Sequence, residues 1–139
     1  MLYSLVYTSR AIRDYNRNDL LSLLLQARNR NKRLEITGML LYTDSRFVQV
    51  LEGEEATVLS LYDDIRDDTR HVNVTTLVEN NIDKRMFPDW TMGYKNIDLQ
   101  HYRNIPGLNL FLDNEQISEP YRILLHFKDD PSCFQKDTI

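Results

Sequence analysis

GMLLYTDSRFVQVLEG, residues 38–53, is the stretch that decides the fold. It contains two apolar runs, 38–42 and 47–51, and the four residues between them match the length of a hairpin loop. Gly53 closes the hairpin. We therefore predict two antiparallel strands here. The segments on either side of this hairpin predict the rest of the domain.

A strand and a helix are predicted before the hairpin. The apolar run from Leu2 to Tyr7 is followed by polar residues and is typical of a first strand. Asn16 can cap a helix whose first turn contains Asp19, where a negative charge suits the helix dipole. Leucines follow at helical spacing, and we expect this helix to end near residues 29–31.

A second helix and two strands are predicted after the hairpin. Residues 72–78 give a fourth strand, and a fifth short run covers residues 90–94. The order β-α-β-β-α-β with one extra strand predicts an α+β fold, a ferredoxin-like sandwich with both helices on one sheet face. In that topology the first and third strands are adjacent and central. Apolar residues at helical spacing define the second helix: Val58, Leu61, Tyr62 and Ile65.

Residues 1–97 are expected to form this domain, and residues 98–139 a C-terminal helical appendage. One helix is expected to start at Ser118, because Pro120 is then well placed in its first turn. Beyond Pro131 the tail is polar, and we expect it to be mobile.

The composition is that of one globular domain and excludes several classes of function. Apolar residues make up 42% of the chain, which argues against disorder. The net charge of −4 comes without a basic block, so neither nucleic acid nor a membrane surface is an expected partner. The single cysteine, Cys133, excludes an internal disulfide and a thiolate metal site. We expect a soluble cytoplasmic protein that holds no metal.

Two polar side chains fall on a strand face that the helices are expected to cover. Strand residues alternate faces, so Gln49 shares its side with Phe47 and Leu51. A buried carboxamide is costly unless it is hydrogen-bonded. Tyr7, from the adjacent first strand, is a natural partner. A structural hydrogen bond that fixes the strand register is the alternative to a functional pair.

Four other residues have a structural and a functional interpretation. Asn31 lies at the expected end of the first helix, where asparagine commonly ends helices, but its carboxamide also suits a ligand edge with a donor and an acceptor. Trp90 and Met92 share a side of the fifth run, where packing is the ordinary role of such residues. His71 follows the second helix, where a surface or capping role is usual.

An enzyme has weak support. No serine or cysteine has a plausible base beside it. An acylphosphatase-like hydrolase on the same fold would use an arginine after the first strand, and Arg10 is near that place. The glycines that would cradle an anion there are missing. We therefore expect no catalytic activity.

Five segments resemble the BLUF family of blue-light sensors that use flavin. They are LVYTSR around Tyr7, Asn31 followed by KRLEITGMLLY, FVQVLEG around Gln49, DDTRH before residue 72, and FPDWTMGY around Trp90. They occur in the family's order and with its spacing, across roughly residues 2–95. Taken singly each is weak, but five in register identify the family.

The resemblance implies a flavin bound noncovalently between the two helices: FAD, with FMN and riboflavin as alternatives. Gln49 is similar to the glutamine between the tyrosine and the flavin N5 and C4 carbonyl. Asn31 matches the residue that pairs with the pyrimidine edge. Leu23 or Leu24 on the first helix and Ile65 on the second match the apolar residues on either side of the ring. The positions near the ribityl and phosphate chain are matched by Arg30, Asp68 and His71. Signal transmission is implied for Trp90 and Met92.

The resemblance also implies a mechanism and an output. An electron and then a proton leave Tyr7 through Gln49, and the hydrogen bonds to the flavin rearrange. The expected output is a contact with an unidentified protein partner or a homo-oligomer. No output domain follows the matched segments, so we expect a short BLUF protein or a part of a larger one. The alternative is a ferredoxin-like interaction module without photoactivity, and an exchanged Tyr7, Gln49 or Asn31 would have favoured it.

Overall fold

The computed structural model describes residues 1–43 and 45–96. The helix predicted from Ser118 and the tail beyond Pro131 lie outside these residues, so the division of the chain at residue 97 stays a prediction. The elements are β1 (Leu2–Ala11), α1 (Arg17–Leu34), β2 (Thr37–Thr43), β3 (Arg46–Glu54), α2 (Glu55–Asp67), β4 (His71–Asn81) and β5 (Gly93–Asn96).

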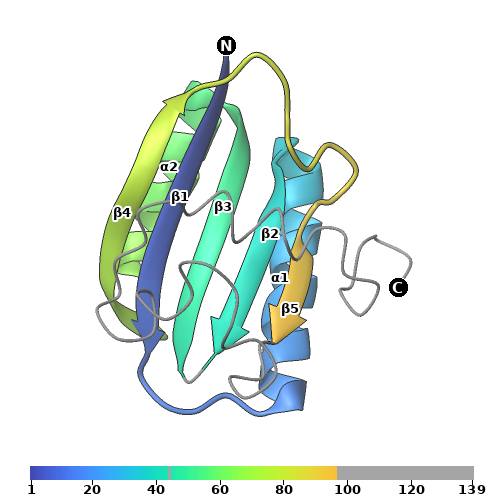
Figure 1. The fold of residues 1–139 in the computed structure, drawn as a ribbon. Coiled ribbons are helices and arrows are strands. Elements are labelled where there is room, and N and C mark those ends of the chain that lie inside the picture. The colour runs from blue at the N-terminus through green and yellow to red at the C-terminus, as the bar shows by residue number, and fades with distance from the viewer. Residues whose placement is uncertain (44, 97–139) are drawn as a thin grey trace, which may run out of the picture.

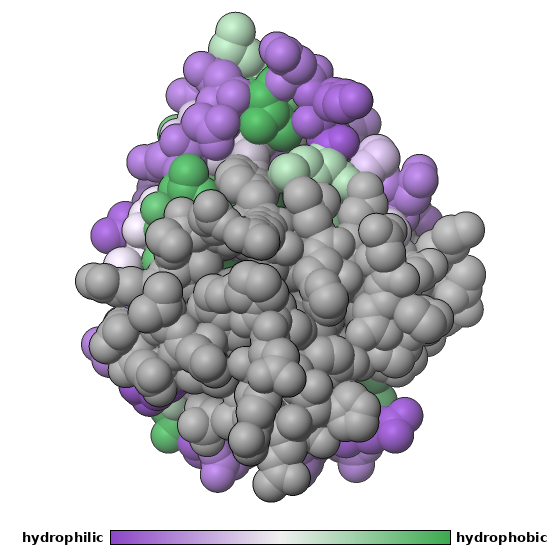
Figure 2. Space-filling model, viewed as in Figure 1, coloured by the Kyte–Doolittle hydropathy of each residue, from purple (hydrophilic) through white to green (hydrophobic). Residues whose placement is uncertain are grey.

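The strands form one sheet in the order β4-β1-β3-β2-β5. Neighbouring strands are antiparallel except for β2 and β5, which run parallel. Both helices lie behind the sheet in Figure 1, and so cover one face of it. This confirms the predicted ferredoxin-like α+β sandwich with a fifth strand, including the adjacency of β1 and β3. Around the edge of the same view, the described surface is mostly hydrophilic (Figure 2).

The core lies between the helices and the sheet. Residues of β1 and β3 such as Leu5 and Leu51 are fully buried there against Val58 of α2 and Leu24 of α1. The predicted capping of α1 is confirmed, since Asn16 accepts a hydrogen bond from the Asp19 backbone N–H at 2.8 Å. Within residues 1–43 and 45–96, no helix is both long and apolar enough to cross a membrane.

The first helix is longer than predicted. The prediction of an end near residues 29–31 was wrong, because α1 continues to Leu34 and its left-handed cap is Glu35, with φ of 57°. Asn31 therefore lies inside the last turn and is fully buried. Its side chain bonds to a distant part of the chain, which removes the competition with the helix backbone that usually makes asparagine end a helix.

The fifth strand begins later than predicted. Trp90 and Met92 lie in the connection before β5, which starts at Gly93, so their assignment to a strand was wrong. A turn explains the delay, since the Trp90 N–H donates to the Phe87 carbonyl. Pairing with β2 starts only where Met39 faces Gly93.

Gly38 of β2 leaves no room for a side chain. A Cβ at this position would lie 1.9 Å from the Val50 carbonyl oxygen, which is backbone and cannot turn away. We expect Gly38→Ala to lower the free energy of unfolding by about 3 kcal/mol or more, measured by urea denaturation.

Gly53 provides the matched control. A Cβ there would meet the Ile36 side chain at 3.2 Å and the Glu35 carbonyl at 3.3 Å, contacts that small shifts relieve. Gly53→Ala should cost about 1 kcal/mol or less. Equal stability losses in the two variants would contradict the packing argument.

Candidate functional site

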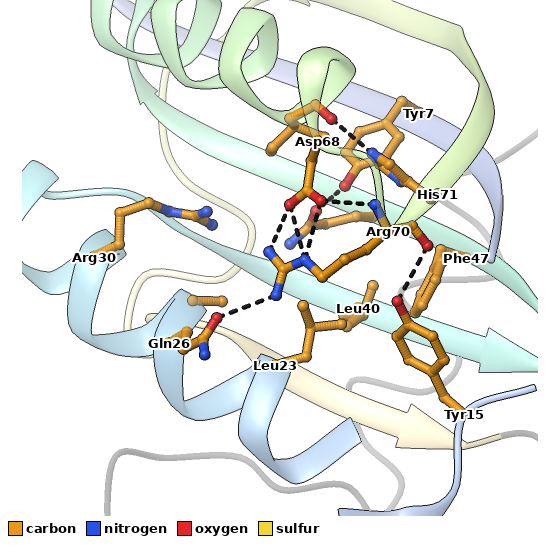
Figure 3. Close-up of a pocket in the computed structure, with 13 residues that line it drawn as sticks. Tyr7, Tyr15, Leu23, Gln26, Arg30, Leu40, Phe47, Asp68, Arg70 and His71 are labelled. Atoms are coloured by element: carbon orange, nitrogen blue, oxygen red, sulfur yellow. Dashed lines mark hydrogen bonds and ion pairs between the residues drawn. The ribbon is translucent and has the colours of Figure 1, made fainter. Parts of the chain in front are cut away.

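A cavity opens between the two helices above the centre of the sheet (Figure 3). The space is about 610 Å³ when its open side toward the solvent is counted with it. The lining residues come from both helices, the central strands and the connections: Tyr7, Tyr15, Leu23, Gln26, Ala27, Arg30, Leu40, Phe47, Gln49, Ile65, Asp68, Arg70 and His71.

Tyr7 and Gln49 form the polar base of this cavity. They are directly opposed in the β1–β3 register, and each side chain is 4% exposed. The Tyr7 hydroxyl donates a hydrogen bond to Gln49 Oε1, while Gln49 Nε2 donates to Met92 Sδ at 3.3 Å. A thioether sulfur accepts hydrogen bonds but cannot donate them. The amide oxygen therefore faces the phenol, and the amide nitrogen faces the sulfur.

The environment of Tyr7 keeps its phenol neutral. Burial raises its pKa far above the ordinary value for tyrosine, and the opposing effect of the nearby Arg30 guanidinium is smaller. The Tyr62 ring lies beside Tyr7 with ring centroids 5.4 Å apart, but its hydroxyl is hydrogen-bonded to Thr76 Oγ1 at 2.7 Å. Of these two phenols, only Tyr7 is bonded to the amide.

Apolar side chains from both helices face the cavity. Leu23 lines it from α1, and Ile65 lines it from α2. Leu24, the alternative to Leu23, is fully buried in the core and is absent from the lining. Consecutive helix positions point about 100° apart, so only one of the two leucines can face a ligand.

The open rim carries charged and polar groups. Arg70 donates to Asp68 through Nη2 at 2.5 Å and to Gln26 Oε1 through Nη1 at 3.1 Å. These bonds connect the C-terminal end of α2 to α1 (Figure 3). The bonds from Arg70 hold the pKa of Asp68 below its usual range. Arg30 also lines the cavity from α1.

His71 is oriented by two hydrogen bonds. Its Nε2 lies 2.6 Å from the Ile65 carbonyl oxygen and must carry the hydrogen there, whereas Nδ1 lies 2.8 Å from Ser9 Oγ. In the neutral ring, Nδ1 therefore accepts from the serine hydroxyl. A ring held at both nitrogens forms a fixed part of the cavity wall.

Besides Leu24, three of the predicted site residues do not line the cavity: Asn31, Trp90 and Met92. The Asn31 side chain donates from Nδ2 to the Thr91 carbonyl at 2.7 Å and accepts from Arg30 Nε at 3.2 Å. Trp90 packs against Phe87, with ring centroids 5.6 Å apart. Met92 reaches the site through its contact with Gln49.

Sequence reasoning missed three polar residues that line the cavity: Gln26, Tyr15 and Arg70. A signal existed only for Arg70, which lies between Asp68 and His71 within the matched DDTRH segment. Gln26 and Tyr15 reach the cavity through the tertiary arrangement alone. Tyr15 does so by donating from its hydroxyl to the Arg70 carbonyl at 3.1 Å.

Comparison with known families identifies the class of protein. The family model described as "Sensors of blue-light using FAD" matches residues 2–93. The chain belongs to the BLUF family. It is a blue-light sensor domain that uses a flavin, as the five matched segments predicted.

Similar proteins are light-regulated cyclases and short BLUF proteins. The photoactivated adenylate cyclase subunit beta of Euglena longa is 42% identical over 92 residues, or 66% of this chain and 11% of the relative. Subunit alpha of Euglena gracilis is 43% identical over 86 residues, which cover 62% of this chain and 8% of the relative. The chain thus spans about a tenth of the length of these relatives.

For two solved structures, the match covers most of this chain and most of the solved chain. BlrB in its dark state has a TM-score of 0.71 at 32% identity, covering 90% of this chain and 92% of BlrB. The photo-activated state of BlsA has a TM-score of 0.75 at 31% identity, covering 91% and 93%.

Proposed function

We propose that this domain detects blue light when Tyr7 gives up an electron and a proton at the base of the cavity, with Gln49 as the proton relay. The observation that carries the proposal is the hydrogen-bonded chain from the Tyr7 hydroxyl through the Gln49 amide to Met92 Sδ. The buried amide at the middle of this chain lines the cavity between the two helices.

The residues around the cavity fit a flavin. Its apolar ring would lie between Leu23 and Ile65, with one polar edge at Gln49. Arg30, Asp68 and His71 at the rim would hold the hydroxylated and phosphorylated chain. Asn31 would meet the pyrimidine edge only after a rearrangement of its side chain, because it does not line the cavity and its carboxamide already bonds to Thr91 and Arg30.

FAD is the flavin we propose, as in the family description. Arg30 and Arg70 line the cavity and supply the positive charge that suits a phosphate. Both FAD and FMN carry a phosphate that these guanidinium groups suit, whereas riboflavin carries none.

The photochemistry follows from the chemistry of the two side chains. When bound, the flavin absorbs blue light and becomes a strong electron acceptor. Removing an electron from the neutral Tyr7 phenol makes its hydroxyl strongly acidic, so the proton leaves along the hydrogen bond to Gln49 Oε1. The carboxamide would accept this proton at Oε1 and give up one from Nε2 toward the flavin, which has taken the electron. When the electron and a proton return to Tyr7, the amide is left rotated or tautomerised.

The signal would leave through Met92 and Trp90. A rotated amide turns its oxygen toward the Met92 sulfur, and these two acceptors cannot bond to each other. The resulting displacement biases the segment before β5. We propose that this segment acts on a protein partner or a second copy of the chain in the cytoplasm, and that the domain itself catalyses no reaction.

The purified chain is expected to be yellow and to shift its flavin absorbance to longer wavelength after blue light, with return in the dark. Absorbance spectra before, during and after illumination make the measurement. Protein that purifies colourless should be mixed with FAD and tested again. A preparation that holds no flavin after this step, or holds it without any shift, would overturn the proposal.

A further inference from the structure

Three consecutive carbonyl oxygens before β5 are each held by a different donor. The Trp90 carbonyl accepts from the Gly38 backbone N–H at 2.9 Å. The Thr91 carbonyl accepts from Asn31 Nδ2 at 2.7 Å, and the Met92 carbonyl accepts from Arg28 Nε at 2.9 Å. Two of the donors are side chains of α1, the helix that also forms a wall of the cavity.

Arg28 is placed unusually for an arginine. Its side chain is 5% exposed, and a buried guanidinium is costly unless its partners compensate. It follows Ala27, which lines the cavity, and it lies one turn before Asn31 on the same helix. An uncharged side chain of similar size would fill this part of the interior at least as well as an arginine.

Met92 is consequently held at two points. Its carbonyl is fixed by Arg28, and its sulfur accepts from Gln49 Nε2. The sulfur constrains the amide only while Met92 stays in place, because the side chain is flexible and its hydrogen bond is weak.

We propose that Arg28 is a positioning residue that fixes Met92, so that the sulfur favours one orientation of the Gln49 amide. The proposal rests on the proposed function for its effect on light responses, but its structural part does not require light. With Arg28 in place, the backbone of Met92 is held, so the sulfur has less room to move away from the rotated amide. Without it, Met92 can move aside, and the rotated state is relieved.

Arg28→Met tests this, because methionine keeps an unbranched apolar stem and loses the donor. Exposed Arg17 on the same helix supplies the control, Arg17→Met. The first measurement is NMR of methionine methyl groups in the protein as isolated, in the dark, with Met92 assigned through Met92→Leu. We expect the Met92 signal to shift or broaden in Arg28→Met and to stay unchanged in Arg17→Met.

The second measurement is dark recovery after blue light. We expect Arg28→Met to recover about threefold to tenfold more slowly than the parent, the range supported by one net hydrogen bond. Loss of thermal stability alone, with an unchanged recovery rate and Met92 signal, would show a purely structural role and overturn the proposal.

Arg28→Lys keeps the test valid if Arg28→Met does not fold. Lysine keeps the charge but has a methylene where Arg28 has Nε, so a bond from its ammonium to the Met92 carbonyl would have a different geometry. The Met92 signal should therefore still change, and an unchanged signal would overturn the proposal. Absence of any photocycle in the parent would count against the proposed function, while the dark NMR result would still decide the role of Arg28.

Discussion

Tyr7→Phe is expected to give a yellow protein that binds flavin and shows no absorbance shift after blue light. The variant removes the hydroxyl and keeps the ring that packs beside Tyr62. Without the hydroxyl, no proton can accompany the electron along the bond to Gln49. Absorbance difference spectra after blue light, on protein with flavin content matched to the parent, measure the effect.

Tyr62→Phe is the matched control. Its ring is also buried and lies 5.4 Å from Tyr7, but its hydroxyl bonds to Thr76 rather than to the amide. This variant should keep the full shift. A normal photocycle in Tyr7→Phe, or its loss in Tyr62→Phe alone, would show that the electron and proton donor has been misassigned.

The second large effect is expected for Gln49→Leu. Leucine retains an apolar volume but cannot relay a proton or change its hydrogen bonds, so flavin should stay bound without a red-shifted state. The buried Tyr7 hydroxyl also loses its acceptor, so the free energy of unfolding should fall by about 1–3 kcal/mol. Difference spectra and urea denaturation of the same preparation separate the two losses.

Gln26→Leu makes the same chemical change elsewhere in the same cavity. Gln26 lines the cavity and accepts from Arg70 at the rim, where it is exposed and has no bond to Tyr7. We expect the amplitude of the red shift to be preserved. If both glutamine variants lost the shift equally, the effect would come from general damage to the cavity rather than from the relay.

The central pair could be predicted because strand geometry is periodic. Alternation placed Gln49 on the covered face with Phe47 and Leu51, and the predicted topology put Tyr7 on the neighbouring strand; the observed register opposes the two residues directly. The flavin itself came from the resemblance and not from strand parity, which only indicates a buried polar pair. The family match then confirmed the class of protein.

The features that could not be predicted depend on contacts between distant residues. The end of α1 and the late start of β5 are set by bonds between residues 28–38 and residues 90–92. Local preference alone made Asn31 end a helix and placed Trp90 in a strand. Helical spacing also left Leu23 and Leu24 as alternatives, because both are apolar and only the packing of α1 distinguishes them.

The Gln49 amide lies between a phenol that donates and a sulfur that only accepts. Its two orientations therefore cannot have equal energy. In the proposed photocycle, light would populate the less favourable orientation, and thermal motion would restore the other without any further energy source. Such a receptor reports how much light arrived within its own relaxation time and keeps no record of the total dose.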